Sequence, residues 1–242
     1  MASRSSIFGV PIDAVTLNEA CDRLCQMLDE GGRHHVLTPN PEMLLTARSN
    51  ETFRAIFQSS ALNVPDGYGL IIASHFLGDP LPERVSGIDL LSALCRRIEG
   101  PVFLLGAAEG VAARAAETLR ASNNGLIIAG THSGSPNPSE EDSILQNING
   151  SGAKVLFVAF GSPKQDLWIA RNLSRMPGIC IAMGVGGSFD FLAGVRSRAP
   201  AWMRTVGLEW LWRLIQEPRR VRRILRAVAL FPILVFLTEK RK

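Results

Sequence analysis

The chain has 242 residues, of which 46% are hydrophobic, and this suffices for one large domain or for one domain with an appendage. Its net charge of +4 belongs to the C-terminal end: residues 213–242 hold nine basic and two acidic side chains, a charge of +7, which leaves −3 on the other 212 residues. The four cysteines form no CxxC pair, which argues against a zinc site, and we expect buried or inert thiols in a reducing cytoplasm.

The first thirteen residues contain no long apolar run, so we expect no secretory signal. Further along, short apolar runs alternate with helical patterns such as "PEMLLTARS". The apolar runs are residues 34–38, 61–64, 101–106, 126–130, 154–161 and 179–186. Buried strands that alternate with helices predict a parallel sheet. We therefore expect an α/β, Rossmann-like fold with flanking helices over residues 1–197, in a strand order that the sequence does not give.

The segments that follow these strands are candidate ligand contacts, because ligands of such sheets bind outside the carboxyl ends of the strands. They are residues 38–40, 65–67, 106–110, 131–132, 161–165 and 184–188. Each one alone is also explained as a tight turn of Gly and Pro, but six at one edge favour a ligand site. None is a GxGxxG or a Walker A loop, so a dehydrogenase is weakly supported.

The predicted appendage, residues 198–242, is helical with expected breaks at Gly207, Pro218 and Pro232. It carries three of the four tryptophans and an eleven-residue apolar run, 227–237, which is shorter than the about 20 residues that span a bilayer. Clustered arginines beside this run indicate a helix lying on an anionic membrane surface. A helix packed on the core, or a subunit interface, is the alternative, and nucleic acid is less well supported because no recognition motif accompanies the charge.

Six strings along the chain resemble the WecG/TagA/CpsF glycosyltransferases, in the same order and over nearly the whole length. They are "TPNPEML", "VPDGYGLI", "ERVSGIDLL", "FGSPKQDLWI", "GVGGSFDFLAG" and "RAPAWMRTVGLEWLWRLIQEPRR". The resemblance implies an inverting enzyme of bacterial surface-polysaccharide synthesis, with a Rossmann-like fold and a C-terminal appendage. It also implies transfer of N-acetylmannosamine or its uronic acid from a UDP-sugar to a sugar on undecaprenyl diphosphate, without a metal or cofactor.

The same resemblance suggests a peripheral protein at the cytoplasmic face of the bacterial inner membrane. Its expected partners are the UDP-sugar, the polyprenyl-diphosphate-linked sugar and the anionic membrane surface; a homo-oligomer is left open. A UDP-glucose transferase for exopolysaccharide is the alternative enzyme. The alternative that is not an enzyme is a membrane scaffold, which would bind vesicles without turning over a UDP-sugar.

A single displacement needs one base for the acceptor hydroxyl, and Asp66 matches the base proposed for the family. Its alternative role is to cap the helix after it. Thr38 and Asn40 match positions of the family's sugar pocket, with Gln165 expected beside them, although Thr-Pro-Asn-Pro is also a turn. We expect Arg84 to contact a phosphate, with a surface salt bridge as the alternative.

The nucleotide is assigned to strand-exit positions, where glycines leave N–H groups open to a diphosphate. The residues are Gly106, Gly184, Gly186 and Asp190, of which Asp190 is otherwise explained as a charge in the first turn of a helix. The chain has no DxD motif and its four histidines do not cluster, so arginines must stabilise the phosphates. For the acceptor diphosphate we predict Arg213, Arg219 and Arg222, ahead of Arg220 and Arg223.

Overall fold

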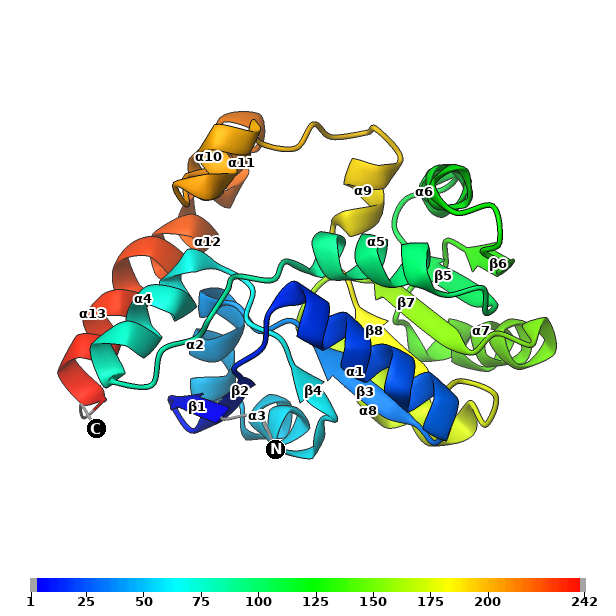
Figure 1. Ribbon diagram of the computed structural model, residues 1–242, viewed down its shortest axis with the longest axis horizontal. Helices are drawn as coiled ribbons and strands as arrows, with labels where there is room; N and C mark the ends of the chain where they lie inside the picture. The colour runs from blue at the N-terminus through cyan, green and yellow to red at the C-terminus, as the bar shows by residue number, and fades with distance from the viewer. Residues whose placement is uncertain (1–3, 240–242) are drawn as a thin grey trace.

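A six-stranded parallel sheet forms the centre of the computed structural model, which describes residues 4–239 (Figure 1). Lys240, Arg241 and Lys242 of the charged tail lie outside the described residues. The strands are β3 (His34–Leu37), β4 (Leu62–Asn63), β5 (Val102–Gly106), β6 (Ile128–His132), β7 (Val155–Ala159) and β8 (Ile181–Gly184), in the order β4-β3-β8-β7-β5-β6. The six predicted strands and the α/β class are confirmed.

Helices cover both faces of this sheet, and neighbouring strand residues alternate between the two faces. Val155 and Phe157 of β7 pack with helices α1, α5, α6 and α9, while Leu156 and Val158 pack with α7 and α8. The helices of the core are α1 (Leu17–Glu30), α2 (Pro41–Ser49), α3 (Glu51–Ser59), α4 (Tyr68–Leu77), α5 (Gly87–Arg97), α6 (Val111–Ser122), α7 (Pro138–Ser151), α8 (Lys164–Asn172), η1 (Leu173–Arg175) and α9 (Ser188–Leu192).

A two-stranded antiparallel hairpin precedes the sheet and was not predicted. Its strands are β1 (Arg4–Ile7) and β2 (Val10–Asp13), joined by Phe8 and Gly9, which both have positive φ angles of 54° and 73°. Two such residues are what a tight hairpin turn requires. Ile7, Val10 and Ile12 are fully buried, so the hairpin extends the core beneath α2, α3 and α4.

The strand exits lie at one edge of the sheet, as expected for parallel strands, with one correction. Thr131 and His132 were predicted to follow a strand ending at residue 130, but they are the last residues of β6. This edge strand begins later because a turn, in which the Leu126 N–H donates to the Asn123 carbonyl, precedes it. The pairing with β5 also shifts register between Val102 and Phe103.

The appendage is a chain of short helical segments that runs along α4 and α2 (Figure 1). Breaks occur near Gly207 and at Pro218, as predicted, but the chain stays helical through Pro232, so that expectation was wrong. A π-helical turn ends two residues before Pro232, and its wider backbone accommodates the missing N–H and the ring. The segments are α10 (Ala201–Thr205), α11 (Glu209–Gln216), η2 (Pro218–Arg220), α12 (Val221–Leu225), η3 (Arg226–Leu230, the π turn) and α13 (Phe231–Thr238).

Two apolar side chains, Phe231 and Val235, anchor the appendage on the core. Phe231 is fully buried and its ring meets that of Phe8 edge-on, with centroids 5.7 Å apart. Gly69 on α4 lets Pro41 of α2 come close, because a Cβ there would lie 2.8 Å from Pro41, and Phe231 packs beside it. The domain boundary between residues 197 and 198 stays a prediction.

Over residues 4–239, we find no helix that combines the length and the apolar character needed to cross a membrane.

Candidate active site

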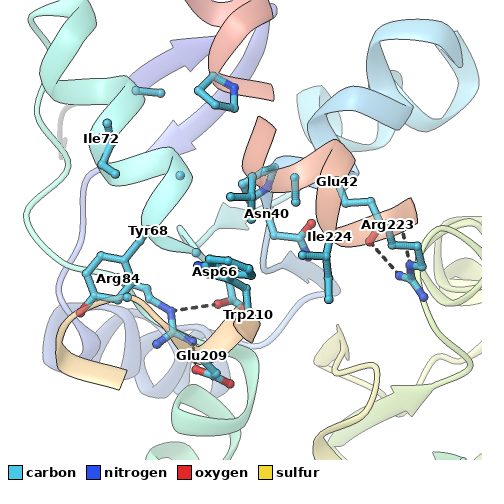
Figure 2. A pocket seen from close by; sticks show the side chains of 18 of the residues that line it. Asn40, Glu42, Asp66, Tyr68, Ile72, Arg84, Glu209, Trp210, Arg223 and Ile224 are labelled. Atoms are coloured by element: carbon cyan, nitrogen blue, oxygen red, sulfur yellow. Dashed lines mark hydrogen bonds and ion pairs between the residues drawn. The ribbon is translucent and has the colours of Figure 1, made fainter. Parts of the chain in front are cut away.

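A cavity of about 470 Å³ lies between the core and the appendage (Figure 2). The core wall comes from the loops after β3 and β4 and from α4, and the opposite wall comes from α11, α12, η3 and α13. One end is polar and the other apolar. The polar and charged side chains are Asn40, Glu42, Asp66, Tyr68, Arg84, Glu209, Arg213, Arg220 and Arg223.

Asp66 sits at the polar end, on the turn that follows β4, with 24% of its side chain exposed. Its carboxylate lies 3.5 Å from the Arg84 guanidinium and accepts a long hydrogen bond, also 3.5 Å, from the Gly87 N–H. In the described structure no side chain caps α4, whose N-cap is Gly67, so the capping role proposed for Asp66 is not what holds it there. Burial raises the pKa of Asp66 above its ordinary value, while the positive charges of Arg84 and Arg213 oppose this shift.

Glu209 holds two arginines beside Asp66, as Figure 2 shows for Arg84. One carboxylate oxygen accepts a 2.7 Å hydrogen bond from Arg84, and the other accepts a 2.8 Å bond from Arg213. The Arg84 guanidinium also stacks 5.6 Å from the ring centroid of Tyr68, whose hydroxyl donates to the Thr205 carbonyl. Burial disfavours the charge on Glu209, but Arg213 and Arg84 together lower its pKa, so the cluster carries one net positive charge before Asp66 is counted.

Two further arginines of the appendage reach the cavity. Arg223 forms a two-bond ion pair with Glu42 of α2, at 2.7 and 2.9 Å, and Figure 2 places this pair across the cavity from Arg84. Arg220 bonds to Glu217 at 2.6 Å. Among the predicted tail arginines, Arg213 lines the cavity, whereas Arg219 and Arg222 are exposed and lie outside its lining.

Asn40 and Thr38 flank Asp66 at the end of β3. Asn40 lines the cavity and also caps α2, since its Oδ1 accepts from the Met43 N–H at 3.0 Å. Thr38 is buried, and a Cβ on Gly87 would lie 3.3 Å from its hydroxyl oxygen. Gly87 thus brings Thr38 close to the same helix start that donates to Asp66.

Gln165 is buried and joins two strand exits rather than lining the cavity. Its Oε1 accepts from the N–H groups of Gly161 and Gly186, both at 3.0 Å. A side chain at Gly184 would come within 2.4 Å of Gln165, so only glycine fits there. Gln165 therefore fixes the loops after β7 and β8, and its contact with a substrate stays a prediction.

The remaining nucleotide candidates lie along the same edge. Gly106 has a φ of 100° and a Cβ there would meet Phe160 and Ala159 at 2.9 and 3.0 Å, so this exit needs glycine. Asp190 stands in the first turn of α9, 3.6 Å from Arg196. These positions are at the strand exits, but their roles stay predictions.

Sequence reasoning missed the acidic partners, Glu209 and Glu42, and the stacking role of Tyr68. The spacing of Glu209 four residues before Arg213 is a helical ion-pair signal, whereas its bond to Arg84 spans 125 residues and leaves no local trace. Over residues 4–239, no group of three or more His, Cys, Asp or Glu side chains is arranged to hold a metal ion.

The cavity therefore combines one carboxylate with a raised pKa, several arginines and an apolar extension. A carboxylate in this position can accept a proton from a hydroxyl group. Arginines can bind phosphate oxygens in pairs, and Arg213, Arg220 and Arg223 come from the appendage while Asp66 comes from the core.

Comparisons with known proteins agree with these features. A family model described as Glycosyl transferase WecG/TagA/CpsF family matches residues 5–242. A relative from Bacillus spizizenii, named N-acetylglucosaminyldiphosphoundecaprenol N-acetyl-beta-D-mannosaminyltransferase, is 34% identical over 201 residues, which are 82% of this chain and 77% of that protein. The resemblance carried by the six strings is confirmed.

Proposed function

The chain belongs to the WecG/TagA/CpsF glycosyl transferase family, and from this we propose that it moves an N-acetylmannosamine-type sugar from a UDP-sugar to a sugar carried on a polyprenyl diphosphate. The name of the Bacillus spizizenii relative supports both the transferred sugar and the lipid-linked acceptor. The observation that carries the proposal is the shared cavity, in which Asp66 of the core faces arginines of the appendage.

In the proposed reaction, the ionised Asp66 takes the proton of an acceptor hydroxyl. The hydroxyl oxygen forms a bond to C1 of the donor sugar as the bond from C1 to the diphosphate breaks, and UDP leaves with that electron pair. One displacement of this kind inverts the configuration at C1. The raised pKa of Asp66 suits a base, because a more basic carboxylate takes the proton more readily.

We assign the two diphosphates to different parts of the molecule. The UDP moiety is assigned to the glycine-rich exits of β5 and β8, at Gly106, Gly184 and Gly186, where no side chain of these residues blocks a close approach. Arg213, Arg220 and Arg223 line the cavity and suit the acceptor diphosphate, so Arg220 and Arg223 replace Arg219 and Arg222 in the proposal. With arginines as the cations, we propose transfer without a metal or another cofactor.

The test is release of UDP by the purified protein with a short-chain lipid-diphosphate acceptor, screened over several UDP-sugars. N-acetylmannosamine is the expected donor, and UDP-glucose tests the alternative. Asp66→Asn should abolish turnover without changing the folded state, and the product should have the inverted anomer. A variant that keeps wild-type kcat would remove Asp66 as the base, and loss of activity in EDTA would overturn metal independence.

We also propose that the appendage holds the protein on the anionic cytoplasmic surface of the membrane. Arg219, Arg222 and Arg226 are exposed, and so are the apolar side chains of Ile233 and Leu237 further along the appendage. Deleting the residues after Gln216 should release the protein from anionic vesicles and lower turnover of the lipid acceptor. Unchanged sedimentation of the truncated protein with vesicles would contradict this.

A further inference from the structure

The cavity continues away from Asp66 as an apolar groove between α4 and the end of the appendage. Its core side is Ile72, Ala73 and Phe76 of α4, which Figure 2 shows in part at Ile72. Its appendage side is made by Ile224, Ala227, Val228, Pro232, Val235 and Phe236. The sugar of the acceptor and the nucleotide of the donor are both polar, so neither of them explains the apolar half of the cavity.

We propose that this groove binds the first isoprene units of the acceptor, those attached to its diphosphate. The inference rests on the proposed function, because it assumes a polyprenyl diphosphate as the acceptor carrier. The proposal assigns the apolar half of the cavity to the lipid chain. Through this half the protein would bind polyprenyl diphosphates in preference to water-soluble phosphates.

The order of side chains along the groove matches the order of groups in such a lipid. Arg213 lies at the end that holds Asp66, because it shares Glu209 with Arg84, and Arg84 pairs with Asp66. Ala73 and Ala227 follow, and the rings of Phe76 and Phe236, with centroids 5.2 Å apart, stand at the far end. A diphosphate among the arginines therefore directs its hydrocarbon chain along the apolar wall.

The exposed rim of the groove connects it with the proposed membrane surface. Ile72 is 66% exposed and Phe236 is 67% exposed, and both line the groove. Ile233 and Leu237 continue this apolar surface outside it. Isolated exposed apolar side chains are ordinary, but a contiguous set beside a cationic pocket marks a lipid contact. A long polyprenyl chain can leave the groove over this rim and enter the bilayer.

The length of the groove sets how much of the chain it can hold. Its lining follows α4 from Gly69 to Phe76, which at about 1.5 Å per residue is about 10 Å. An isoprene unit has four chain bonds, and since three extended bonds span about 3.6 Å, a unit spans about 4.8 Å and the groove suits about two units. Affinity should therefore depend on the first units and not on later ones.

The experiment measures binding of soluble prenyl diphosphates with one to four isoprene units by calorimetry, using the full chain. We expect affinity to rise by at least about tenfold per unit up to about two units, because methylene groups leave water, and then to level off. Inorganic diphosphate should bind most weakly. An affinity that does not depend on chain length would overturn the proposal.

Ala227→Trp fills the groove, and Ala229→Trp is the matched control, because Ala229 lies on the same π turn but is exposed and outside the lining. We expect Ala227→Trp to remove the dependence on chain length and Ala229→Trp to keep it. Equal effects of the two variants would contradict the groove assignment. Equally strong competition by a lysophospholipid would show that the groove takes any lipid chain, which would also overturn it.

Measurements of sugar transfer test the groove and the proposed glycosyl transfer independently of each other. Binding that depends on chain length, without transfer of any sugar, would refute the glycosyl transfer and leave the groove. Transfer to lipid acceptors whose KM does not change with prenyl length, measured below their micellar concentrations, would refute the groove and leave the transfer.

Discussion

The two walls of the cavity are held in place by different forces. On the core wall, Asp66 and Asn40 stand on turns that leave a buried parallel sheet, and backbone hydrogen bonds such as Asp66 N–H to the Pro39 carbonyl fix them. The appendage wall is joined to the core by side chains: Phe231 and Val235 are its buried anchors, and ion pairs add to them.

In the proposed mechanism, the core wall carries out the chemical step and the appendage wall binds the acceptor. Removing a group from the core wall should change the chemical step with little effect on the structure. Removing a contact of the appendage wall should lower the fraction of molecules in which the appendage is docked. The exposed Arg223–Glu42 pair contributes only about 0–1 kcal/mol, so the buried Phe231, Val235 and Glu209 should supply most of the docking free energy. The predictions below test this separation.

The largest effect is expected at the core wall. Asp66→Asn should lower kcat by about 10³-fold, because general base catalysis contributes about 10²–10⁴-fold. The Km of the acceptor and the thermal unfolding temperature should stay near those of the wild type. Steady-state kinetics measures this, with Asp29→Asn, an exposed change on α1, as the control. A large rise in KM with kcat preserved would place Asp66 in binding instead.

The apolar anchor of the appendage comes next. Phe231→Ala should cost about 3 kcal/mol of docking free energy, which corresponds to about 10²-fold in kcat/KM for the lipid acceptor. Hydrogen exchange should increase in residues 221–238 and stay unchanged in the sheet. Ile215→Ala, at a side chain 64% exposed and outside the cavity lining, is the control. Exchange that rises throughout the sheet would mean that the two walls are not separable.

A third prediction distinguishes the arginines that line the cavity from those outside it. Arg220→Gln should raise the acceptor KM by about 10–100-fold, since a charge-assisted hydrogen bond contributes about 1.5–3 kcal/mol. Arg219→Gln, one residue away and exposed, should change it less than about twofold. A larger rise in KM for Arg219→Gln than for Arg220→Gln would favour Arg219 as the arginine that binds the acceptor, as expected from the sequence.

The smallest effect concerns pH and tests the core wall again. Asp66 must be ionised to act, and burial raises its pKa above the ordinary value of 3.8. Activity should therefore be full above that raised pKa and fall by about tenfold per pH unit below it. The pH profile of kcat/KM shows this acid limb, and Asp66→Glu should shift it. A flat profile down to pH 4 would argue against the raised pKa.

The sequence predicted the six strands, their helices and the edge that carries the site, because runs buried on both faces of a sheet have a local signature. Strand order could not be predicted, since pairing such as β3 with β8 joins residues far apart in the chain. Which tail arginines line the cavity could not be predicted: Arg220 and Arg223 line it, whereas Arg219 and Arg222 do not. Pro218 interrupts the helix between Arg213 and Arg220, so the faces of the two segments cannot be related by counting residues.

Because the chain is synthesised from its N-terminus, the core wall of the cavity is made before the appendage wall. The ribosome releases the core before the appendage, and N-terminal units fold first while chains grow at about 5–20 residues per second. Asp66 and the sheet can then be in place while Arg213, Arg220 and Arg223 are still in the exit tunnel. A nascent chain should therefore lack a complete acceptor site until its last helices have left the tunnel and packed on the core.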